Sequence, residues 1–122
     1  MKILIADDEL RLRKVVAMFL KKSGHDLIEV SDGQQALAAL EDNDPDVVVL
    51  DVVMPVMDGI EALRRIRAGN RHKDIPVILL TANISVADRE EGIKAGASAY
   101  VTKPFSPKDL LEKIIETAGR EG

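Results

Sequence analysis

The sequence has 122 residues, of which 46% are hydrophobic and 2% aromatic, with 17 basic and 21 acidic side chains and a formal net charge of −4. This length fits one domain over residues 1–122, and the acidic balance argues against a nucleic-acid-binding surface. The absence of cysteine excludes disulfides and thiolate metal sites, and the apolar run Met1–Ile5 is too short for a signal peptide or a membrane span, so we expect a cytoplasmic protein without a membrane partner.

The first half of the chain predicts alternating strands and helices. Short runs of β-branched residues indicate strands, and apolar residues spaced three and four apart indicate helices. In chain order these are a strand at Lys2–Ala6, a helix through Leu12–Leu20, a strand at Leu27–Val30, a helix opened by a capping box of Ser31 with Gln34 and ending at Asn43–Pro45, and a strand at Val47–Leu50. The strand at Leu27–Val30 is more polar and is expected at an edge, whereas the wholly apolar strand at Val47–Leu50 is expected at the centre.

The second half of the chain continues the alternation. In chain order it contains a helix capped by Asp58 with Glu61 and ending at Gly69–Asn70, a strand at Ile75–Leu80, a helix capped by Ser85 with Asp88 and ending at Gly96, a strand at Ala99–Thr102, and a helix that begins at Ser106–Pro107 and runs to Ala118. The helix ending at Gly96 contains Gly92, whose low helix propensity makes this helix the least stable and the expected moving part.

Regular alternation of five strands with five helices predicts an α/β fold. Because right-handed crossovers lay the helices over the sheet, the strands are expected to be parallel, with helices on both faces. The carboxyl ends of parallel strands share one edge, where open α/β sheets bind their ligands. Five polar residues follow those ends and form the candidate site: Asp7, Asp8, Asp51, Thr81 and Lys103.

Three carboxylates at one edge of a sheet need a counter-charge. Two carboxylates about 4 Å apart repel by roughly 4 kcal/mol at an effective dielectric constant of about 20. Protonation of one acid with a raised pKa would relieve this repulsion, and so would a divalent cation beside the ammonium of Lys103. Since there is no cysteine and both histidines lie on expected connections, the ligands are oxygens, which favour Mg²⁺ over Zn²⁺.

A hard cation, an ionised carboxylate, a lysine and a hydroxyl can together accept a phosphoryl group. Asp51 would attack phosphorus, the cation and Lys103 would balance the charge on the phosphoryl oxygens, and Thr81 would bond the transferred group. The expected product is an aspartyl phosphate.

Five short motifs at these strand ends resemble one protein family. They are Asp7-Asp8, Asp51 followed by Met54-Pro55-Val56-Met57-Asp58-Gly59, Leu80-Thr81-Ala82, Gly96-Ala97 before Tyr100, and Lys103-Pro104-Phe105. Each motif is weak alone, but all five in this order span essentially the whole chain and resemble the receiver domain of bacterial two-component response regulators. The resemblance implies a CheY-like, flavodoxin-like (βα)5 fold, a doubly wound five-stranded parallel sheet with strand order 2-1-3-4-5.

The resemblance also implies roles for the acidic residues. Asp51 matches the phosphoacceptor and a metal ligand. Asp8 resembles the direct Mg²⁺ ligand, Asp7 a ligand through water, and the backbone carbonyl of Val53 a further protein ligand, with Mn²⁺ able to substitute. The implied cofactor is therefore Mg²⁺.

Four further matches concern the phosphoryl group and the switch. Thr81 and Lys103 match residues that contact the phosphoryl group. Thr81 and Tyr100 correspond to a switch pair, in which the hydroxyl moves to the phosphoryl group and the ring turns inward. The resemblance implies that the peptide bond before Pro104 is cis, although few X-Pro bonds are.

By the same resemblance, the partner is a sensor histidine kinase or a phosphotransfer protein that donates from phosphohistidine. Phosphorylation would then alter the face formed by the fourth helix, the fifth strand and the fifth helix, which addresses an unknown downstream effector. A phosphorylation-dependent homodimer is a further expectation, and direct binding of nucleic acid is not expected. The domain would act as a phosphoacceptor switch rather than an enzyme, limited to Mg²⁺-dependent self-phosphorylation and autodephosphorylation.

Val53 and Asn83 lie two residues beyond Asp51 and Thr81, where the family varies and water reaches the phosphoryl group. Both residues are expected to tune the dephosphorylation rate. An apolar Val53 should hinder in-line attack by water and lengthen the lifetime of the phosphoryl group.

Two other classes of protein share parts of this pattern. Aspartate-nucleophile, Mg²⁺-dependent phosphohydrolases combine the same groups, but their nucleophile follows the first strand and a second aspartate stands two residues on. Here the acidic pair comes first and residue 53 is valine. A flavodoxin-like flavin binder needs a phosphate loop rich in glycine and hydroxyls after the first strand, where Asp7-Asp8 would repel the phosphate.

Overall fold

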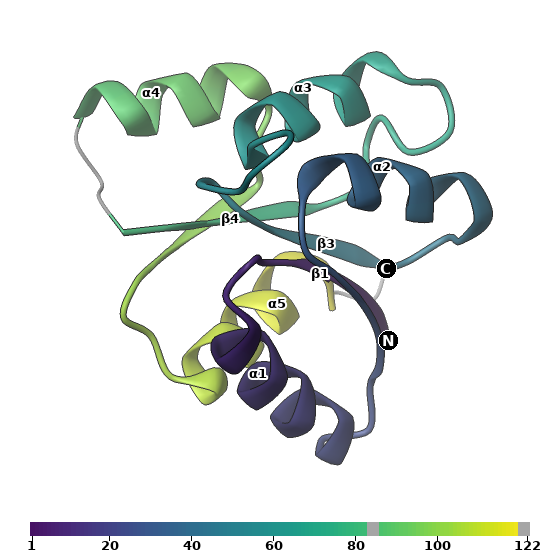
Figure 1. The fold of residues 1–122 in the computed structure, drawn as a ribbon, viewed down its shortest axis with the longest axis vertical. Helices are drawn as coiled ribbons and strands as arrows, with labels where there is room; N and C mark the ends of the chain where they lie inside the picture. Colours follow the sequence, from purple (N-terminus) through teal and green to yellow (C-terminus); the bar gives the residue numbers. More distant parts are fainter. Residues whose placement is uncertain (83–85, 120–122) are drawn as a thin grey trace.

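Five parallel strands in the order β2-β1-β3-β4-β5 form the centre of the protein, in a computed structural model that describes residues 1–82 and 86–119 (Figure 1). For residues 86–88 only the backbone is described. In chain order the elements are β1 (Lys2–Ala6), α1 (Leu10–Lys22), β2 (Asp26–Val30), α2 (Gly33–Asp42), β3 (Val47–Asp51), α3 (Gly59–Ala68), β4 (Val77–Thr81), α4 (Val86–Ala95), β5 (Ala99–Thr102) and α5 (Pro107–Ala118). The α/β fold and the strand order implied by the resemblance are both confirmed.

The helices form one layer on each face of the sheet. Figure 1 shows α1 and α5 on one side and α2, α3 and α4 on the other. The chain moves outward from β1 to β2 and then returns past β1 to β3, so right-handed crossovers place α1 and α2 on opposite faces. The reversal falls between β1 and β3, and the carboxyl ends of these two strands flank the crevice where such folds bind ligands.

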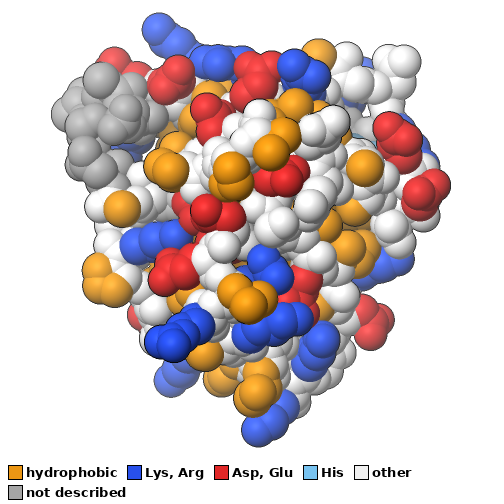
Figure 2. Space-filling model, in the orientation of Figure 1, with side chains coloured by type: hydrophobic (Ala, Val, Ile, Leu, Met, Phe, Trp, Pro, Cys, Tyr) orange, Lys and Arg blue, Asp and Glu red, His pale blue; other side chains and the backbone are white. Residues whose placement is uncertain are grey.

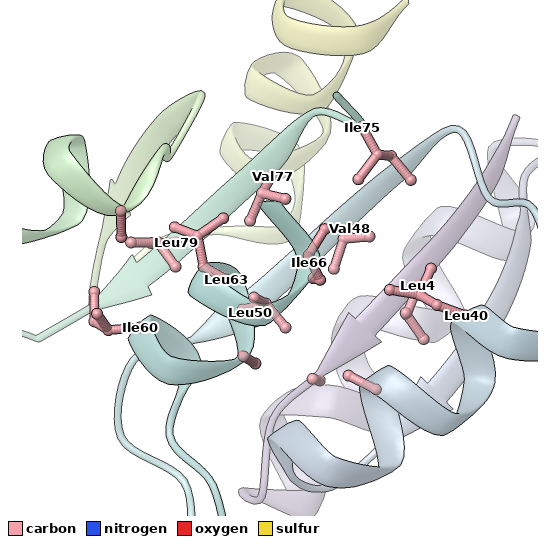
Figure 3. Close-up of a cluster of buried hydrophobic side chains, with 14 of the residues drawn as sticks. Leu4, Leu40, Val48, Leu50, Ile60, Leu63, Ile66, Ile75, Val77 and Leu79 are labelled. Atoms are coloured by element: carbon pink, nitrogen blue, oxygen red, sulfur yellow. The ribbon is translucent and has the colours of Figure 1, made fainter. Parts of the chain in front are cut away.

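The core is split by the sheet into two aliphatic clusters. Every residue of β3 is buried, and successive side chains point to opposite faces. Val48 and Leu50 lie in the cluster beneath α2, α3 and α4, where Figure 3 shows them near Leu63 and Ile66 of α3. Val47 and Val49 lie in the cluster beneath α1 and α5. Burial on both faces explains why this strand is apolar without alternation, and it fixes Asp51 at its end.

Two of the predicted helix caps are confirmed. The Asp58 side chain accepts a hydrogen bond from the Glu61 N–H at 2.8 Å and begins α3. The Ser106 hydroxyl oxygen accepts one from the Asp109 N–H at 3.0 Å and begins α5. The cap predicted at Ser85 with Asp88 lies outside the described residues and side chains.

The predicted cap of α2 is wrong by one residue. Asp32, rather than Ser31, is the N-cap, and its side chain accepts from the Gln35 N–H at 2.8 Å. The Gln35 side chain then accepts from the Ser31 N–H at 2.8 Å. The sequence contains two overlapping cap patterns, and the carboxylate is the stronger acceptor for an amide.

The fourth strand begins later than predicted, at Val77 instead of Ile75. Pro76 has no N–H to give to the sheet, but its carbonyl accepts from the Val48 N–H at 3.0 Å. The strand therefore starts after the proline and extends to Thr81.

The loop from β3 to α3 contains a strained residue. Val56 has φ of 67° and is the only non-glycine residue with positive φ among those described. The Met57 N–H donates to the Pro55 carbonyl at 2.6 Å, which closes a three-residue γ-turn around Val56. A β-branched side chain is poorly suited to this backbone conformation.

We expect Val56→Gly to stabilise the protein by about 0.5 to 1 kcal/mol, because relief of left-handed strain exceeds the entropy that glycine gains in the unfolded chain. Little packing is lost, since Val56 is 75% exposed. Urea unfolding would measure the change. Val53→Gly is the matched control, because Val53 is 76% exposed in the same loop without positive φ and its replacement should destabilise. If both variants lost the same free energy of unfolding, the inference that the Val56 backbone is strained would be wrong.

Candidate functional site

The carboxyl ends of the strands bring the predicted site residues together. Asp51 is the last residue of β3 and is buried, and Thr81 is the last residue of β4 and is buried as well. Asp7 follows β1 directly, and Ala6 pairs with Leu50 in the register of β1 with β3. This register sets the loop after β1 beside the end of β3.

Asp51 is held by contacts to both of its carboxylate oxygens. Lys103 Nζ donates to Oδ2 at 2.7 Å, and the Val53 N–H donates to Oδ1 at 3.2 Å. Gly59 at the start of α3 permits a close approach, because a Cβ at that position would lie 2.2 Å from the Asp51 carbonyl oxygen. The Gly59 N–H donates to the Val52 carbonyl at 2.9 Å, so α3 begins tightly against the end of β3.

Asp7 is fully buried, yet one of its carboxylate oxygens has no hydrogen bond. The Glu9 N–H donates to Oδ1 at 2.9 Å. Oδ2 has no hydrogen-bond partner, and its nearest cation, Lys103 Nζ, stands 3.7 Å away, which is within ion-pair range but beyond hydrogen-bond range. A buried carboxylate oxygen without a hydrogen-bond partner destabilises the folded protein, and such an oxygen is well suited to bind a cation.

The ionisation of the site follows from this burial. The pKa of Asp7 is raised from 3.8 to about 6, chiefly by burial and in smaller part by the negative charge of Asp51, against the lowering effects of the Glu9 N–H and Lys103. Burial alone would lower the pKa of Lys103, but its hydrogen bond to Asp51 and the charges of Asp51 and Asp7 raise it above its ordinary value. Lys103 is therefore a permanent cation at neutral pH.

The acidic cluster fits a hard divalent cation. Asp7, Asp8 and Asp51 each offer a carboxylate oxygen, and these three atoms lie within 4.8 Å of one another. Octahedral Mg²⁺ with bonds of about 2.1 Å holds its ligand oxygens at most about 4.2 Å apart, so one acid needs a small movement or a bridging water. Asp8 is exposed, which leaves it accessible to an ion from solvent.

Tyr100 lies beneath α4 rather than free at the surface. Its hydroxyl donates to the Arg89 carbonyl at 2.7 Å, and the Arg89 guanidinium lies 6.0 Å from the centre of the ring. A Cβ on Gly92 would lie 1.9 Å from the tyrosine hydroxyl oxygen. Gly92, interpreted from the sequence as a weak point of the helix, therefore makes room for the tip of this ring.

The other predicted residues have these positions. The backbone N–H of Lys103 donates to the Thr81 carbonyl at 2.8 Å, and the peptide bond between Lys103 and Pro104 is cis. Val53 is exposed beside Asp51. Asn83 lies outside the described residues.

The roles of three residues around the site were not predicted from the sequence. Arg13 donates to the Asp7 carbonyl, Gly59 admits the end of β3, and Gly92 admits Tyr100. Nothing in one sequence distinguishes Arg13 from the four other cations of α1. The glycines could be recognised only once their neighbours in space were known.

No helix in the described part of the chain is long and apolar enough to cross a membrane.

Comparison with known proteins gives a family match over most of the chain. A model of the family described as "Response regulator receiver domain" matches residues 3–115. The probable transcriptional regulator ycf27 of Guillardia theta is 44% identical over 113 residues, which are 93% of this chain and 43% of that protein. The phosphate regulon transcriptional regulatory protein PhoB of Pseudomonas aeruginosa is 38% identical over 120 residues, which are 98% of this chain and 52% of that protein. The chain thus spans about half the length of these relatives.

Solved structures agree with these sequence matches. The chemotaxis response regulator CheY4 of Vibrio cholerae superimposes with a TM-score of 0.90 at 34% identity, covering 95% of this chain and 97% of that one. The receiver domain of a sensor histidine kinase from Pseudomonas aeruginosa, which has a magnesium ion coordinated in its active-site cleft, has a TM-score of 0.89 at 34% identity and covers 98% of both chains. These relatives are receiver domains and regulators rather than hydrolases.

Proposed function

The chain belongs to the response regulator receiver domain family, and from this membership we propose that it is a phosphorylation switch whose acceptor is Asp51. The observation that carries the proposal is the pairing of a buried Asp51 carboxylate with Lys103 beside the unsatisfied oxygen of Asp7. The donor is the phosphohistidine of a sensor histidine kinase or phosphotransfer protein.

The proposed reaction moves a phosphoryl group from nitrogen to oxygen. An Asp51 carboxylate oxygen attacks phosphorus, a P–O bond forms, the P–N bond breaks, and the imidazole leaves with the electron pair and takes a proton. Lys103 shifts from its hydrogen bond with Asp51 to the phosphoryl oxygens, and Thr81 donates its hydroxyl to one of them. Because Asp51 is buried, its carboxylate is largely shielded from bulk water before the donor arrives.

The donor set of the site supports Mg²⁺ as the cofactor, with Mn²⁺ as a substitute. Asp8 would bind it directly, Asp7 through water or directly, and Asp51 and the Val53 carbonyl would complete the protein ligands. Bound Mg²⁺ supplies neutralisation of the charge shared by the carboxylates and the phosphoryl oxygens.

The output of the proposed switch is a face made by α4, β5 and α5. Phosphorylation adds about −1.5 to −2 charge at Asp51 and draws the Thr81 hydroxyl toward it. Tyr100 would then leave its contact with Arg89 and Gly92 and turn inward, which releases α4. Ile93 on α4 and Ile115 on α5 are exposed hydrophobic residues of these two helices, and they are available to an effector or a second copy of the chain.

The surface of α1 supports recognition of a protein donor. This helix carries five cations and no acid in thirteen residues, and Leu10, Val15 and Met18 are exposed on it. Figure 2 shows Lys and Arg side chains gathered over the lower part of the molecule, where α1 lies in Figure 1. A donor with acidic and apolar side chains would fit this surface, which we do not assign to nucleic acid.

The proposal is tested by incubating the protein with acetyl phosphate and Mg²⁺ and reading its intact mass. We expect a gain of one phosphoryl group that requires the metal and is lost with hydroxylamine, which cleaves acyl phosphates. A protein that stays unlabelled with Mg²⁺, or a label that resists hydroxylamine, would refute the acyl phosphate.

Val53→Asn is expected to shorten the lifetime of the phosphoryl group. Val53 is exposed beside Asp51 and offers water no hydrogen bond, whereas an amide could orient an attacking water. One such hydrogen bond, at about 0.5 to 1.5 kcal/mol, corresponds to roughly two- to tenfold faster hydrolysis. Loss of label after removal of the donor would measure the rate, with Val56→Asn as a control in the same loop. Equal rates for wild type and Val53→Asn would contradict the role of Val53.

A further inference from the structure

Arg13 on α1 reaches back to the loop that carries the acidic pair. Its Nη1 donates to the Asp7 carbonyl oxygen at 2.8 Å, and its Nε donates to Glu29 Oε1 at 3.3 Å. The side chains of Arg13 and Glu29 are each only 13% exposed. One guanidinium therefore joins α1, the loop after β1 and the edge strand β2.

This contact completes a set of hydrogen bonds around Asp7. The Asp7 N–H donates to the Val30 carbonyl at 3.1 Å, the Asp7 carbonyl accepts from Arg13, and Oδ1 accepts from the Glu9 N–H. Oδ2, which faces Lys103 and Asp51, is the one hydrogen-bonding atom of this residue left without a partner. Asp7 is thus fixed on every side except toward the acidic cluster.

Glu29 in turn fixes Arg13. Its carboxylate lies 3.1 Å from Lys14 Nζ and 3.7 Å from Lys21 Nζ, in addition to Arg13. Burial alone would raise the pKa of Glu29, but hydrogen bonds from Lys14 and Arg13 hold it below its ordinary value, so the carboxylate is charged at neutral pH. The guanidinium is therefore held at both ends, by a charged acid and by a backbone carbonyl.

We propose that Arg13 is a positioning residue for the metal site, which holds the backbone of Asp7 so that its free oxygen stays within reach of an ion shared with Asp8 and Asp51. This inference rests on the proposed function. Repulsion among the three acids drives the loop after β1 away from β3, and the anchor on the Asp7 carbonyl opposes that movement. Contacts of this kind, one step removed from a metal, commonly change its affinity by about 10- to 100-fold.

The direction of the change in Mg²⁺ affinity distinguishes a positioning role of Arg13 from an electrostatic one. Arg13 is a cation near a site for a cation, so removal of its charge alone would make Mg²⁺ bind more tightly. Loss of positioning would make Mg²⁺ bind more weakly. A decrease in affinity for Arg13→Met therefore cannot come from electrostatics.

The experiment compares Mg²⁺ affinity among three variants by calorimetry on folded protein. Arg13→Met, which keeps an unbranched apolar stem, is expected to raise the Kd for Mg²⁺ about tenfold. Arg13→Lys keeps the charge but lacks the fork that reaches both partners, so it is expected to weaken binding as well. Arg11→Met removes the same charge from an exposed position on α1 and is expected to leave the Kd unchanged or slightly lower. An Arg13→Met protein that binds Mg²⁺ as tightly as wild type, or more tightly, overturns the proposal.

Two further measurements keep the test informative if Arg13→Met is less stable. The Asp7 amide donates to the Val30 carbonyl and the Glu9 amide donates to Asp7 Oδ1. Hydrogen exchange of these two amides in the metal-free protein is expected to quicken in Arg13→Met, and unchanged exchange would count against positioning. Labelling by acetyl phosphate is expected to return to the wild-type rate at saturating Mg²⁺, since the residue acts through the metal site. If the wild type binds Mg²⁺ and is labelled, and Arg13→Met binds Mg²⁺ equally well, the inference about Arg13 is wrong but the proposed function stands. A wild type that does neither defeats the proposed function.

Discussion

Asp51→Asn is expected to abolish labelling by acetyl phosphate, as read by intact mass in the presence of Mg²⁺. Asparagine keeps the shape of the side chain and can still accept from the Val53 N–H, but its amide is not a nucleophile toward phosphorus. No other acid in the site combines burial with a direct contact to Lys103, since Asp7 stands 3.7 Å from its ammonium and Asp51 stands 2.7 Å from it. The loss should therefore be complete rather than partial.

The control for this experiment is Asp42→Asn, an exposed acid on α2 away from the site. This variant is expected to be labelled as the wild type is. Persistent labelling of Asp51→Asn would move the acceptor to another residue, and peptide mapping would identify it. Loss of labelling in both variants would point to damage to the fold, which circular dichroism would detect.

Asp7→Asn is expected to stabilise the metal-free protein by about 2 to 3 kcal/mol above pH 6.5. The pKa of Asp7 is 3.8 in the unfolded reference and about 6 in the folded protein, so the folded state disfavours the ionised form. Between these two values the folded state binds more protons, and the stability of the wild type falls as the pH rises. Above the higher value the full penalty is present, and asparagine removes it while adding a donor that can face Asp51.

Urea unfolding in EDTA at several pH values would measure this gain. The difference between Asp7→Asn and wild type should be small near pH 4, increase through pH 6, and level off above it. Mg²⁺ should stabilise the wild type more than the variant and so narrow the difference, because a bound ion neutralises the same charge. A variant that is less stable than wild type at pH 7.5 in EDTA would contradict the inference that the folded state disfavours the ionised form of Asp7.

The fold was predictable because burial of apolar side chains contributes most of its stability, and buried side chains recur at regular spacings along the sequence. Every residue of the run Val47–Leu50 is apolar, which indicates a strand covered on both faces of a sheet. The helices repeat their apolar residues at helical spacing. The edge position of β2 followed from its polarity. The predicted cap of α2 was wrong by one residue because Ser31 and Asp32 both fit a capping pattern. A single hydrogen bond, from the Gln35 N–H to Asp32, distinguishes the two.

The sequence predicted which residues form the site but not the contacts that hold them in place. Strand ends indicated which residues would meet, because a parallel sheet brings all its carboxyl ends to one edge. How Asp7 and Tyr100 are held was not predictable, because Arg13 and Gly92 act through contacts between distant elements. The roles of Asn83 and of the cap at Ser85 stay predictions, as they lie outside the described residues.

The contact of Tyr100 with Gly92 limits the positions that α4 can adopt. The ring tip occupies the volume that a side chain would fill at residue 92, so it props the helix from below, next to Leu79. If the ring swings away, it leaves a hollow bounded by bare helix backbone, and close-packed interiors do not keep such voids. If the proposed rotation of Tyr100 occurs, α4 would be free to move toward the position that the ring has left, and the rotation of one side chain would displace a whole helix.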